Sequence, residues 1–419
     1  MDISKKSYRG AILFLLVCFF FPALPSSAIE TQEQWDTAFL SVNPDQDPNI
    51  ADPGNFPAEE FAWHGHYWIR AYVSMAETYG DRKYLDKAVA LIDHMFYYRD
   101  DARFSRGALD LRAAPYDTAP LYYLTHRGEA APGWRKLWNG QIRVDVVTDG
   151  MITQAIMRFV ALVVHSPRFS GYRGKAKGYL SKVEETVSAW DDSFAYDRNG
   201  VPGSYWYPMD DRSGLSSTEV PFNQSAVMAA TLLLLDDVKG GVPEYRKKAK
   251  AVLDFWRMKR RIVSGDAYEW NYYLLKKKYG VEDFDHSHMD MSFFTIAYRY
   301  GLMTDEEMKR LSNTLTGKLY KGNARVAGYL DGSGTGDGYY AGLDWIELTP
   351  FTRKALDIAL EVYNRHYLRP SWAKPFLGWA EILRWKSLIN KQPSPSVSFT
   401  GHQKVGAPGS AGSARVWSA

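Results

Sequence analysis

The nine residues from Glu282 to Asp290 hold the densest group of chemically reactive side chains in the sequence, Glu-Asp-Phe-Asp-His-Ser-His-Met-Asp. Acidic residues suit the start of a helix, where they cap or face its positive end. Capping does not explain His286 and His288. His286 and Asp290 are four positions apart, and a carboxylate beside an imidazole orients the ring and raises its basicity. We therefore predict that both histidines are catalytic, with Asp290 as the orienting group.

Polar residues also gather at the starts of four other segments with helical periodicity. These starts are Trp63-His64-Gly65-His66-Tyr67-Trp68, Thr148-Asp149-Gly150, Phe222-Asn223-Gln224 and Gly342-Leu343-Asp344-Trp345. Helices that run in one direction around a ring bring their starts to one mouth. The sequence therefore predicts one converging polar site. In it we place a substrate-binding group made of His64, His66, Tyr67, Asp149, Asp344 and Trp345.

Two aromatic runs precede expected helices, Ser204-Tyr205-Trp206-Tyr207 and Tyr268-Glu269-Trp270-Asn271-Tyr272-Tyr273. Aromatic residues make up 15% of the chain, more than a core requires, and sugar rings stack on indole and phenol faces. Trp206 and Trp270 are therefore predicted to bind substrate, with packing inside the protein as the alternative. Tyr272 and Asn223 complete the predicted catalytic set. In elimination or epimerisation of a uronic acid, an amide neutralises the sugar carboxylate while His or Tyr moves the C–H proton.

Two other chemistries fit the same residues. Hydrolysis of a glycosidic bond needs two carboxyl groups at a fixed separation. Its candidates are Asp149, Glu282, Asp283, Asp290 and Asp344. A metal centre is the second alternative, with ligands drawn from His64, His66, His286, His288 and Asp290, but the sequence has no tight metal-ligand motif. We therefore expect neither a metal nor another cofactor.

Helical periodicity dominates from Phe61 onward and groups the segments into helix–turn–helix pairs. The expected pairs are 63–79 with 83–97, 150–165 with 174–190, 222–238 with 244–258, 287–300 with 304–320, and 345–367 with 372–388. The first members are the more apolar and the second carry charged stripes, which predicts a buried inner ring and an exposed outer ring. Irregular spacing disfavours a linear solenoid. We predict an all-α domain over residues 61–390, an incomplete (α/α) toroid of about five helical hairpins without strands.

The first 28 residues have the three parts of a cleavable signal peptide: three basic residues, an apolar run over 11–24, and small residues up to Ala28. The apolar run is short for a bilayer span, and we expect no other span in the chain. Cys18 lies within this leader and is the only cysteine. The sequence therefore predicts a periplasmic or secreted protein whose mature chain is free of cysteine.

Charge and composition limit the partners. Removing the leader takes three of the 51 basic and one of the 48 acidic residues, which leaves 48 against 47. Such balance gives no basis for binding nucleic acid.

Residues 29–60 are polar, and we interpret them as an extended lead-in with one short helix near 32–40. Residues 391–419 are rich in Ser, Pro and Gly and are predicted to be a disordered tail.

The order of the hairpins and the polar starts of their inner helices resemble the secreted (α/α)-toroid carbohydrate-active proteins. These include lyases of the alginate-lyase type, uronyl C5-epimerase catalytic domains and six-hairpin glycosidases. The resemblance covers most of residues 61–388 at the level of fold, and His64-Gly65-His66-Tyr67-Trp68 is only loosely like the Asn-Asn-His-Ser-Tyr-Trp stretch of alginate lyases. No family's catalytic set maps onto the chain residue by residue.

The resemblance implies an exported enzyme that acts on a polysaccharide or oligosaccharide. The leading hypothesis is proton abstraction at a uronic acid, by a lyase or a C5-epimerase. The alternatives are a glycoside hydrolase with a carboxylate pair and a non-catalytic glycan-binding protein of the cell envelope.

Overall fold

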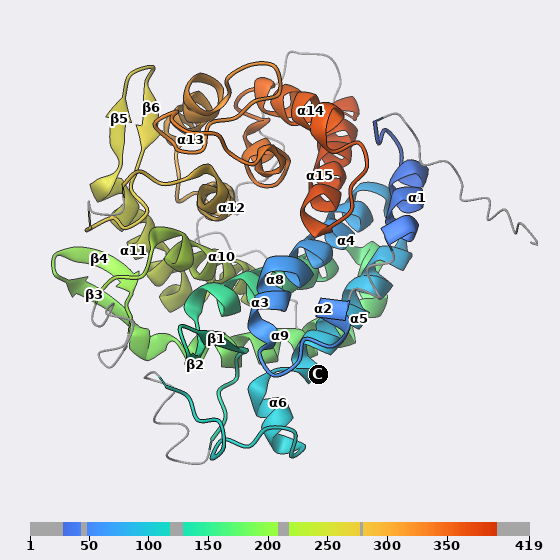
Figure 1. Ribbon diagram of the computed structural model, residues 1–419, viewed down its shortest axis with the longest axis vertical. Coiled ribbons are helices and arrows are strands. Elements are labelled where there is room, and N and C mark those ends of the chain that lie inside the picture. The colour runs from blue at the N-terminus through green and yellow to red at the C-terminus, as the bar shows by residue number, and fades with distance from the viewer. Residues whose placement is uncertain (1–27, 43–47, 118–128, 208–217, 277–279, 392–419) are drawn as a thin grey trace, which may run out of the picture.

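The computed structural model describes residues 28–42, 48–117, 129–207, 218–276 and 280–391. Long helices of this part lie in two rings around a common centre (Figure 1). The inner helices are α4 (His66–Tyr79), α8 (Val146–His165), α10 (Phe222–Lys239), α12 (Phe284–Arg299) and α15 (Ala373–Asn390). The outer helices are α5 (Arg82–Tyr97), α9 (Arg173–Ser188), α11 (Pro243–Lys259), α13 (Asp305–Asn313) and α14 (Lys354–His366). This is the (α/α) toroid that the sequence predicts.

Residue patterns explain which helices lie inside. The inner helix α10 is buried over almost its whole length, and its leucine run at 232–235 offers apolar groups on all sides. The outer helix α11 buries one stripe, with Ala249, Val252, Leu253 and Trp256 three or four positions apart. Trp256 is fully buried between the rings, and burial of such a side chain contributes about 1.5–3 kcal/mol.

The fifth predicted hairpin is reversed in the structure. Residues 345–367 were expected to form an inner helix, but Trp345–Leu348 form only a short 3₁₀ turn, η8. Pro350 follows at once and cannot continue a helix, so α14 begins anew at Lys354 and lies in the outer ring. The inner position is taken by α15, which packs against α4 and closes the ring. The incomplete member of the toroid is therefore η8, a short turn where the other hairpins have an inner helix.

The lead-in also contributes to the ring. Its helix α1 (Gln32–Val42) lies where the sequence predicts a short helix, and it covers α15. The indole Nε1 of Trp35 donates a hydrogen bond of 3.1 Å to the carbonyl of Phe376, and Trp35 is fully buried. The predicted signal peptide and the predicted tail lie almost wholly outside the described residues.

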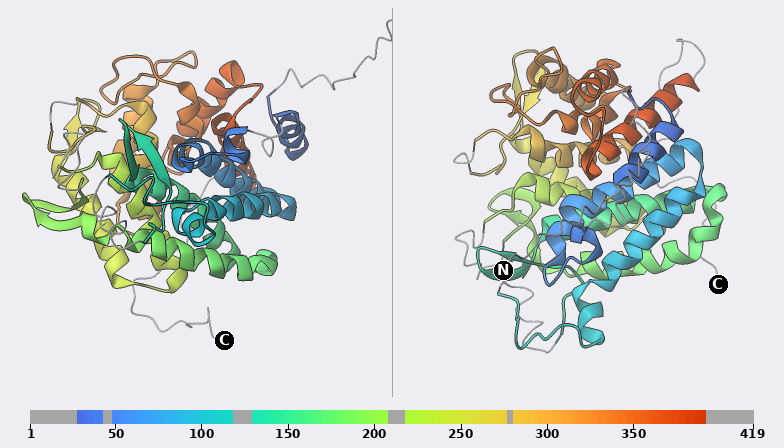
Figure 2. Two further views of the ribbon diagram at one scale, coloured as in Figure 1. Left: turned by 60° about the horizontal axis from the view of Figure 1, so that its bottom comes forward. Right: turned by 45° about the vertical axis from the view of Figure 1, so that its right-hand side comes forward.

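Three short antiparallel hairpins correct the prediction that no strands occur. They are β1 (Arg135–Trp138) with β2 (Gln141–Val144), β3 (Phe194–Arg198) with β4 (Val201–Tyr205), and β5 (Arg261–Val263) with β6 (Ala267–Glu269). Each precedes an inner helix, and the left view of Figure 2 shows β1–β2 in front of the ring. The first two turn at Asn139-Gly140 and Asn199-Gly200, whose φ angles are all positive. Asn-Gly between short strands strongly predicts a β-hairpin. The prediction of helices alone rests on helical periodicity and does not use this dipeptide.

Short helical segments connect these elements. They are α2 (Pro48–Ala51), α3 (Pro57–Glu60), η2 (Phe61–Gly65), α6 (Asp100–Ser105), η3 (Pro167–Tyr172), η4 (Asp191–Ser193), η6 (Thr314–Leu319), η7 (Gly338–Gly342) and η8.

Among the described helices, only α8 is long and apolar enough to span a membrane. This qualifies the expectation that no segment beyond the leader has that composition. Because 83% of its apolar window is buried, α8 is accounted for as a core helix.

Candidate active site at the mouth of the toroid

The inner helices all begin at one end of the ring, which we call the mouth. The hydroxyl of Tyr67 in α4 lies 3.0 Å from Nε2 of His288 in α12. The ammonium of Lys374 at the start of α15 lies 5.3 Å from the ring centre of Tyr67 and 5.2 Å from that of Tyr340 in η7. The starts of α4, α12, α15 and the η7 turn therefore meet at the mouth.

A buried relay lies beneath the mouth. Asp344 accepts two hydrogen bonds from Arg70, of 2.6 and 3.1 Å, and its Oδ2 lies 2.9 Å from Nδ1 of His288. Burial lowers the pKa of His288 to about 4, so the ring is neutral at pH 7. Nδ1 then donates to Asp344, and Nε2 accepts from the Tyr67 hydroxyl. Burial alone would raise the pKa of Asp344, but the Arg70 guanidinium and His288 hold it well below its usual range.

This relay is closed to solvent. Tyr67 and Asp344 are fully buried and His288 is 1% exposed. Burial also raises the pKa of Tyr67 well above its ordinary value. The structure therefore places His288 and Asp344, predicted to act on or bind substrate, in an internal network that positions α4 against α12.

The other two predicted histidines of the mouth differ from each other. His66 is buried, its Nδ1 donates to the carbonyl of Ala62, and burial holds its pKa well below its ordinary value. The side chain of His64 is 42% exposed and lies 3.9 Å from Glu60. Of these two, only His64 is open to a substrate.

His286 pairs with Asp283 rather than with Asp290. Nδ1 of His286 lies 2.7 Å from Oδ2 of Asp283, whose other oxygen accepts the backbone N–H of His286 and caps α12. In the first turn of a helix the side chain leans toward the N-terminus, where the cap lies. The ring of Tyr272 is 5.1 Å from that of His286. The structure thus brings the predicted pair Tyr272 and His286 together at a partly exposed position.

Asp290 lies deeper, beside Glu282. Its Oδ2 accepts a 2.8 Å hydrogen bond from the indole N–H of Trp270, and both carboxyl groups are fully buried. Burial raises the pKa of each well above its ordinary value, and the charge of Asp290 adds to the effect on Glu282. Both acids are buried, and a carboxylate oxygen of Glu282 lies within 4.8 Å of atoms of Asp283 and His286.

Asp285 is the carboxyl group that the sequence reasoning missed. It is half-buried at the start of α12, and its Oδ1 has no hydrogen-bond partner among the described residues. Burial raises the pKa of Asp285 to about 6, and repulsion from Asp337 and Asp283 adds to the shift. An acid at a helix start suits the capping position, but Asp283 occupies it in α12.

Asp337 and Lys374 complete this group. Asp337 is exposed just before η7 and accepts a 3.1 Å hydrogen bond from Tyr339. The ammonium of Lys374 donates to the Tyr340 hydroxyl at 3.1 Å, and burial lowers its pKa. The sequence signal for Asp337 is its position in the glycine-rich stretch 328–342, beside two tyrosines. Nothing in the sequence marks Lys374.

Several residues predicted to be catalytic or to bind substrate lie inside the protein. Trp270 and Trp345 are fully buried, so their ring faces contact protein. Asn223 is 1% exposed. Asp149 accepts hydrogen bonds from the Trp134 N–H and the Trp190 indole, and burial raises its pKa to about 8. Asp149 thereby connects the first turn of α8 to Trp134 and Trp190.

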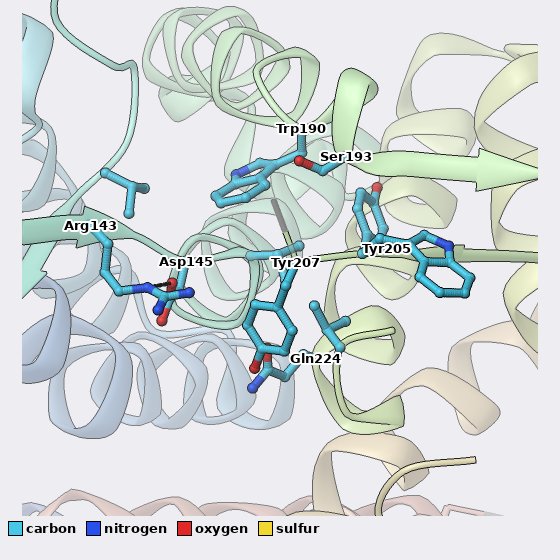
Figure 3. Close-up of a pocket in the computed structure, with 11 residues that line it drawn as sticks. Arg143, Asp145, Trp190, Ser193, Tyr205, Tyr207 and Gln224 are labelled. Carbon is cyan, nitrogen blue, oxygen red and sulfur yellow. Dashed lines mark hydrogen bonds and ion pairs between the residues drawn. The ribbon is translucent and has the colours of Figure 1, made fainter. Parts of the chain in front are cut away.

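Trp206 borders a small cavity between β2 and the start of α10. Arg143, Asp145, Tyr207 and Gln224 surround it, and Figure 3 shows the Tyr207 ring beside Gln224. The volume is about 10 Å³, which is room for a single water rather than a sugar. Trp206 is 4% exposed, and the Arg198 guanidinium covers its ring. This tryptophan is therefore packed, against the prediction.

Comparisons with known proteins identify the fold. No family model matches the chain, and no curated protein matches it. Among solved structures, a GH76 α-mannanase of Bacteroides thetaiotaomicron is similar with a TM-score of 0.51, 9% identity, and coverage of 85% of this chain and 97% of that one. An inactive α-1,6-mannanase variant of Salegentibacter sp., in complex with α-1,6-mannotetrose, has a TM-score of 0.49, 12% identity, and coverage of 85% and 99%. The chain therefore has an (α/α)-toroid fold in common with the Bacteroides α-mannanase.

Proposed function

We propose that this chain is a glycoside hydrolase that acts on a polysaccharide or oligosaccharide at the mouth of the toroid. The observation that carries the proposal is Asp285, a half-buried carboxyl with an unpartnered oxygen and a pKa near 6, close enough to Asp337 for the two to repel. Glycosidic hydrolysis uses such a pair, in which the group with the raised pKa protonates the leaving oxygen. Asp337, exposed and held by Tyr339, is the second carboxylate.

The charges of the mouth support hydrolysis over proton abstraction at a uronic acid. An elimination needs a cation or amide for the sugar carboxylate, together with an accessible base. The predicted amide, Asn223, and the predicted base, His288, are both buried. The cation Lys374 interacts with the negative charges of Asp285 and Asp337, which raise its pKa. The same negative charges would repel the carboxylate of a uronate. His286 beside Tyr272 is the one predicted catalytic pair that is accessible, and it keeps elimination as an alternative in the assay.

The fold supports the proposal in a general way. The similar Bacteroides structure is an α-mannanase, so the toroid is suited to glycan hydrolysis, although a shared fold does not determine the substrate. The predicted leader adds the proposal that the enzyme is exported, which would place it among extracellular or periplasmic glycans.

The test is a panel of neutral and uronic-acid polysaccharides, including α-mannan, incubated with the mature chain. New reducing ends without the ultraviolet absorbance of an unsaturated uronate indicate hydrolysis. Asp285→Asn should lower kcat by about 10²–10⁴-fold, the usual contribution of general acid–base catalysis, and Asp337→Asn should have an effect of similar size. Asp331→Asn is the matched control, since Asp331 is exposed nearby in the same loop. Full activity of Asp285→Asn, or an unsaturated product, would refute the proposal.

A further inference from the structure

A network of charged side chains continues from Arg70 and Asp344 of the relay into the interior of the ring. Arg70, Arg158, Arg299 and Arg384 supply four guanidinium groups, and Asp344, Glu347 and Glu381 supply three carboxylates. Each carboxylate has close partners. Glu347 accepts from Arg299 at 2.8 Å and from Arg384, and Glu381 accepts from Arg384 at 2.7 Å and from Ser74 at 2.6 Å.

Of these four guanidinium groups, Arg158 has the longest ion pair. Its Nη2 donates to the Ser292 hydroxyl at 2.9 Å and lies 3.9 Å from Asp344, whose oxygens Arg70 and His288 already occupy. Its Nε is buried without a partner among the described residues. Only 17% of the Arg158 side chain is exposed. A buried charge is normally paired, so this cation needs an anion.

Arg158 borders a pocket at the end of the ring opposite the mouth, which we call the distal pocket. The last turns of α4, α8, α10 and α12 line it, and its volume is about 490 Å³, within the range of small-molecule sites. Apolar side chains, among them Leu162, Phe169, Leu234 and Ile296, form much of its wall.

The other charged groups of the pocket do not neutralise Arg158. Asp237 lies 2.6 Å from His165, and Glu77 is exposed at the rim. Neither forms an ion pair with Arg158 among the described residues. Arg168 adds a further exposed cation, and its guanidinium lies against Gly80. The wall thus combines apolar side chains with charged ones, among which Arg158, Arg168 and Arg299 are cations.

We propose that the distal pocket binds a small organic anion, with its charged group on Arg158 and Arg168 and its apolar body against Leu162, Phe169 and Leu234. A carboxylate, sulfate or phosphate group would satisfy the unpartnered guanidinium edge. The apolar wall selects an organic anion over an inorganic one, because burying its body gains hydrophobic free energy. This site is separate from the mouth and does not depend on the proposed hydrolysis.

The experiment uses the mature chain with three probes at equal ionic strength: benzoate, which has charge and an apolar ring, benzamide, which has the ring without the charge, and sulfate, which has the charge alone. Isothermal titration calorimetry and thermal unfolding measure binding. Benzoate should bind with one site per chain and raise Tm. Benzamide and sulfate should each bind at least about tenfold more weakly than benzoate. Benzamide loses a charge-assisted hydrogen bond, and sulfate loses the burial of an apolar ring.

Two variants and a control test the residues. Arg158→Gln should weaken benzoate binding by about tenfold or more without lowering Tm in the absence of ligand, because its ion pair with Asp344 is long, at 3.9 Å. Arg168→Ala changes an exposed residue and should weaken binding by about threefold. Arg353→Ala, exposed and remote from the pocket, should bind as the parent chain does. No benzoate binding, equal binding of benzamide or sulfate, or unchanged binding by Arg158→Gln would overturn the proposal.

Discussion

The mouth and the distal end of the ring carry opposite charge, and both follow from the parallel inner helices. Helix N-termini carry partial positive charge, which stabilises the carboxylates of Asp283 and Asp285 at the mouth. Helix C-termini carry partial negative charge, which favours His165 and Arg299 at the distal end. Asp283 and Asp285 lie at the mouth, whereas Arg158, Arg168 and Arg299 line the distal pocket.

Pairing distinguishes the groups that hold the ring together from those left available. Arg70, Asp344 and His288 contact one another at 2.6 to 3.1 Å inside the protein, although Nε of Arg70 has no partner among the described residues. Asp285 at the mouth and Arg158 at the distal pocket each keep a polar atom without a partner among the described residues. Paired groups are expected to set stability and unpaired groups to set function, which the following substitutions test.

The largest effect on stability should come from the paired group Asp344. Asp344→Ala leaves Arg70, which is 3% exposed, without its counter-ion. Breaking a buried pair in this way costs about 3–5 kcal/mol of unfolding free energy. Urea unfolding of this variant beside Arg158→Gln makes the comparison direct, since the latter removes a cation whose ion pair with Asp344 is 3.9 Å long. Equal losses in the two variants would mean that pairing does not separate the two groups.

A smaller and pH-dependent effect is expected at Asp149, a buried acid in the first turn of α8. Its folded pKa of about 8 lies above its unfolded value, so the folded chain binds more protons between these pKa values. Its stabilising contribution is complete at low pH and is lost as pH rises, by up to about 1.4 kcal/mol for each pH unit between about pH 5 and pH 7. Asp149→Asn lacks this titration, so the difference in unfolding free energy between the parent chain and the variant should change with pH by this slope. A difference that does not change with pH would show that Asp149 is ionised in the folded chain.

The sequence predicts the rings better than the site. Alternation of apolar and amphipathic helices identifies four inner helices, because a continuous apolar surface such as that of α10 can only be buried. It fails after Trp345, where one proline decides between a turn and a helix. Polar residues at helix starts mark the mouth, but the sequence cannot separate a carboxyl that pairs internally, such as Asp344, from one left free, such as Asp285. That depends on contacts between segments far apart in the chain, including Arg70 with Asp344 and Lys374 with Tyr340.

The smallest effect is expected at Lys374, and it tests the acid proposed at the mouth. A general acid must be protonated, so kcat/KM should fall as pH rises through the Asp285 pKa of about 6. Burial is the main cause of that raised pKa; Asp337 and Asp283 raise it further, whereas His286 and Lys374 lower it. Lys374→Met removes one lowering charge and should move the alkaline limb upward by about half a pH unit. Lys386→Met, at the far end of the same helix and paired with Glu30, should leave the limb in place. A downward shift, or the same shift in both variants, would show that the limb does not report the carboxyl of Asp285.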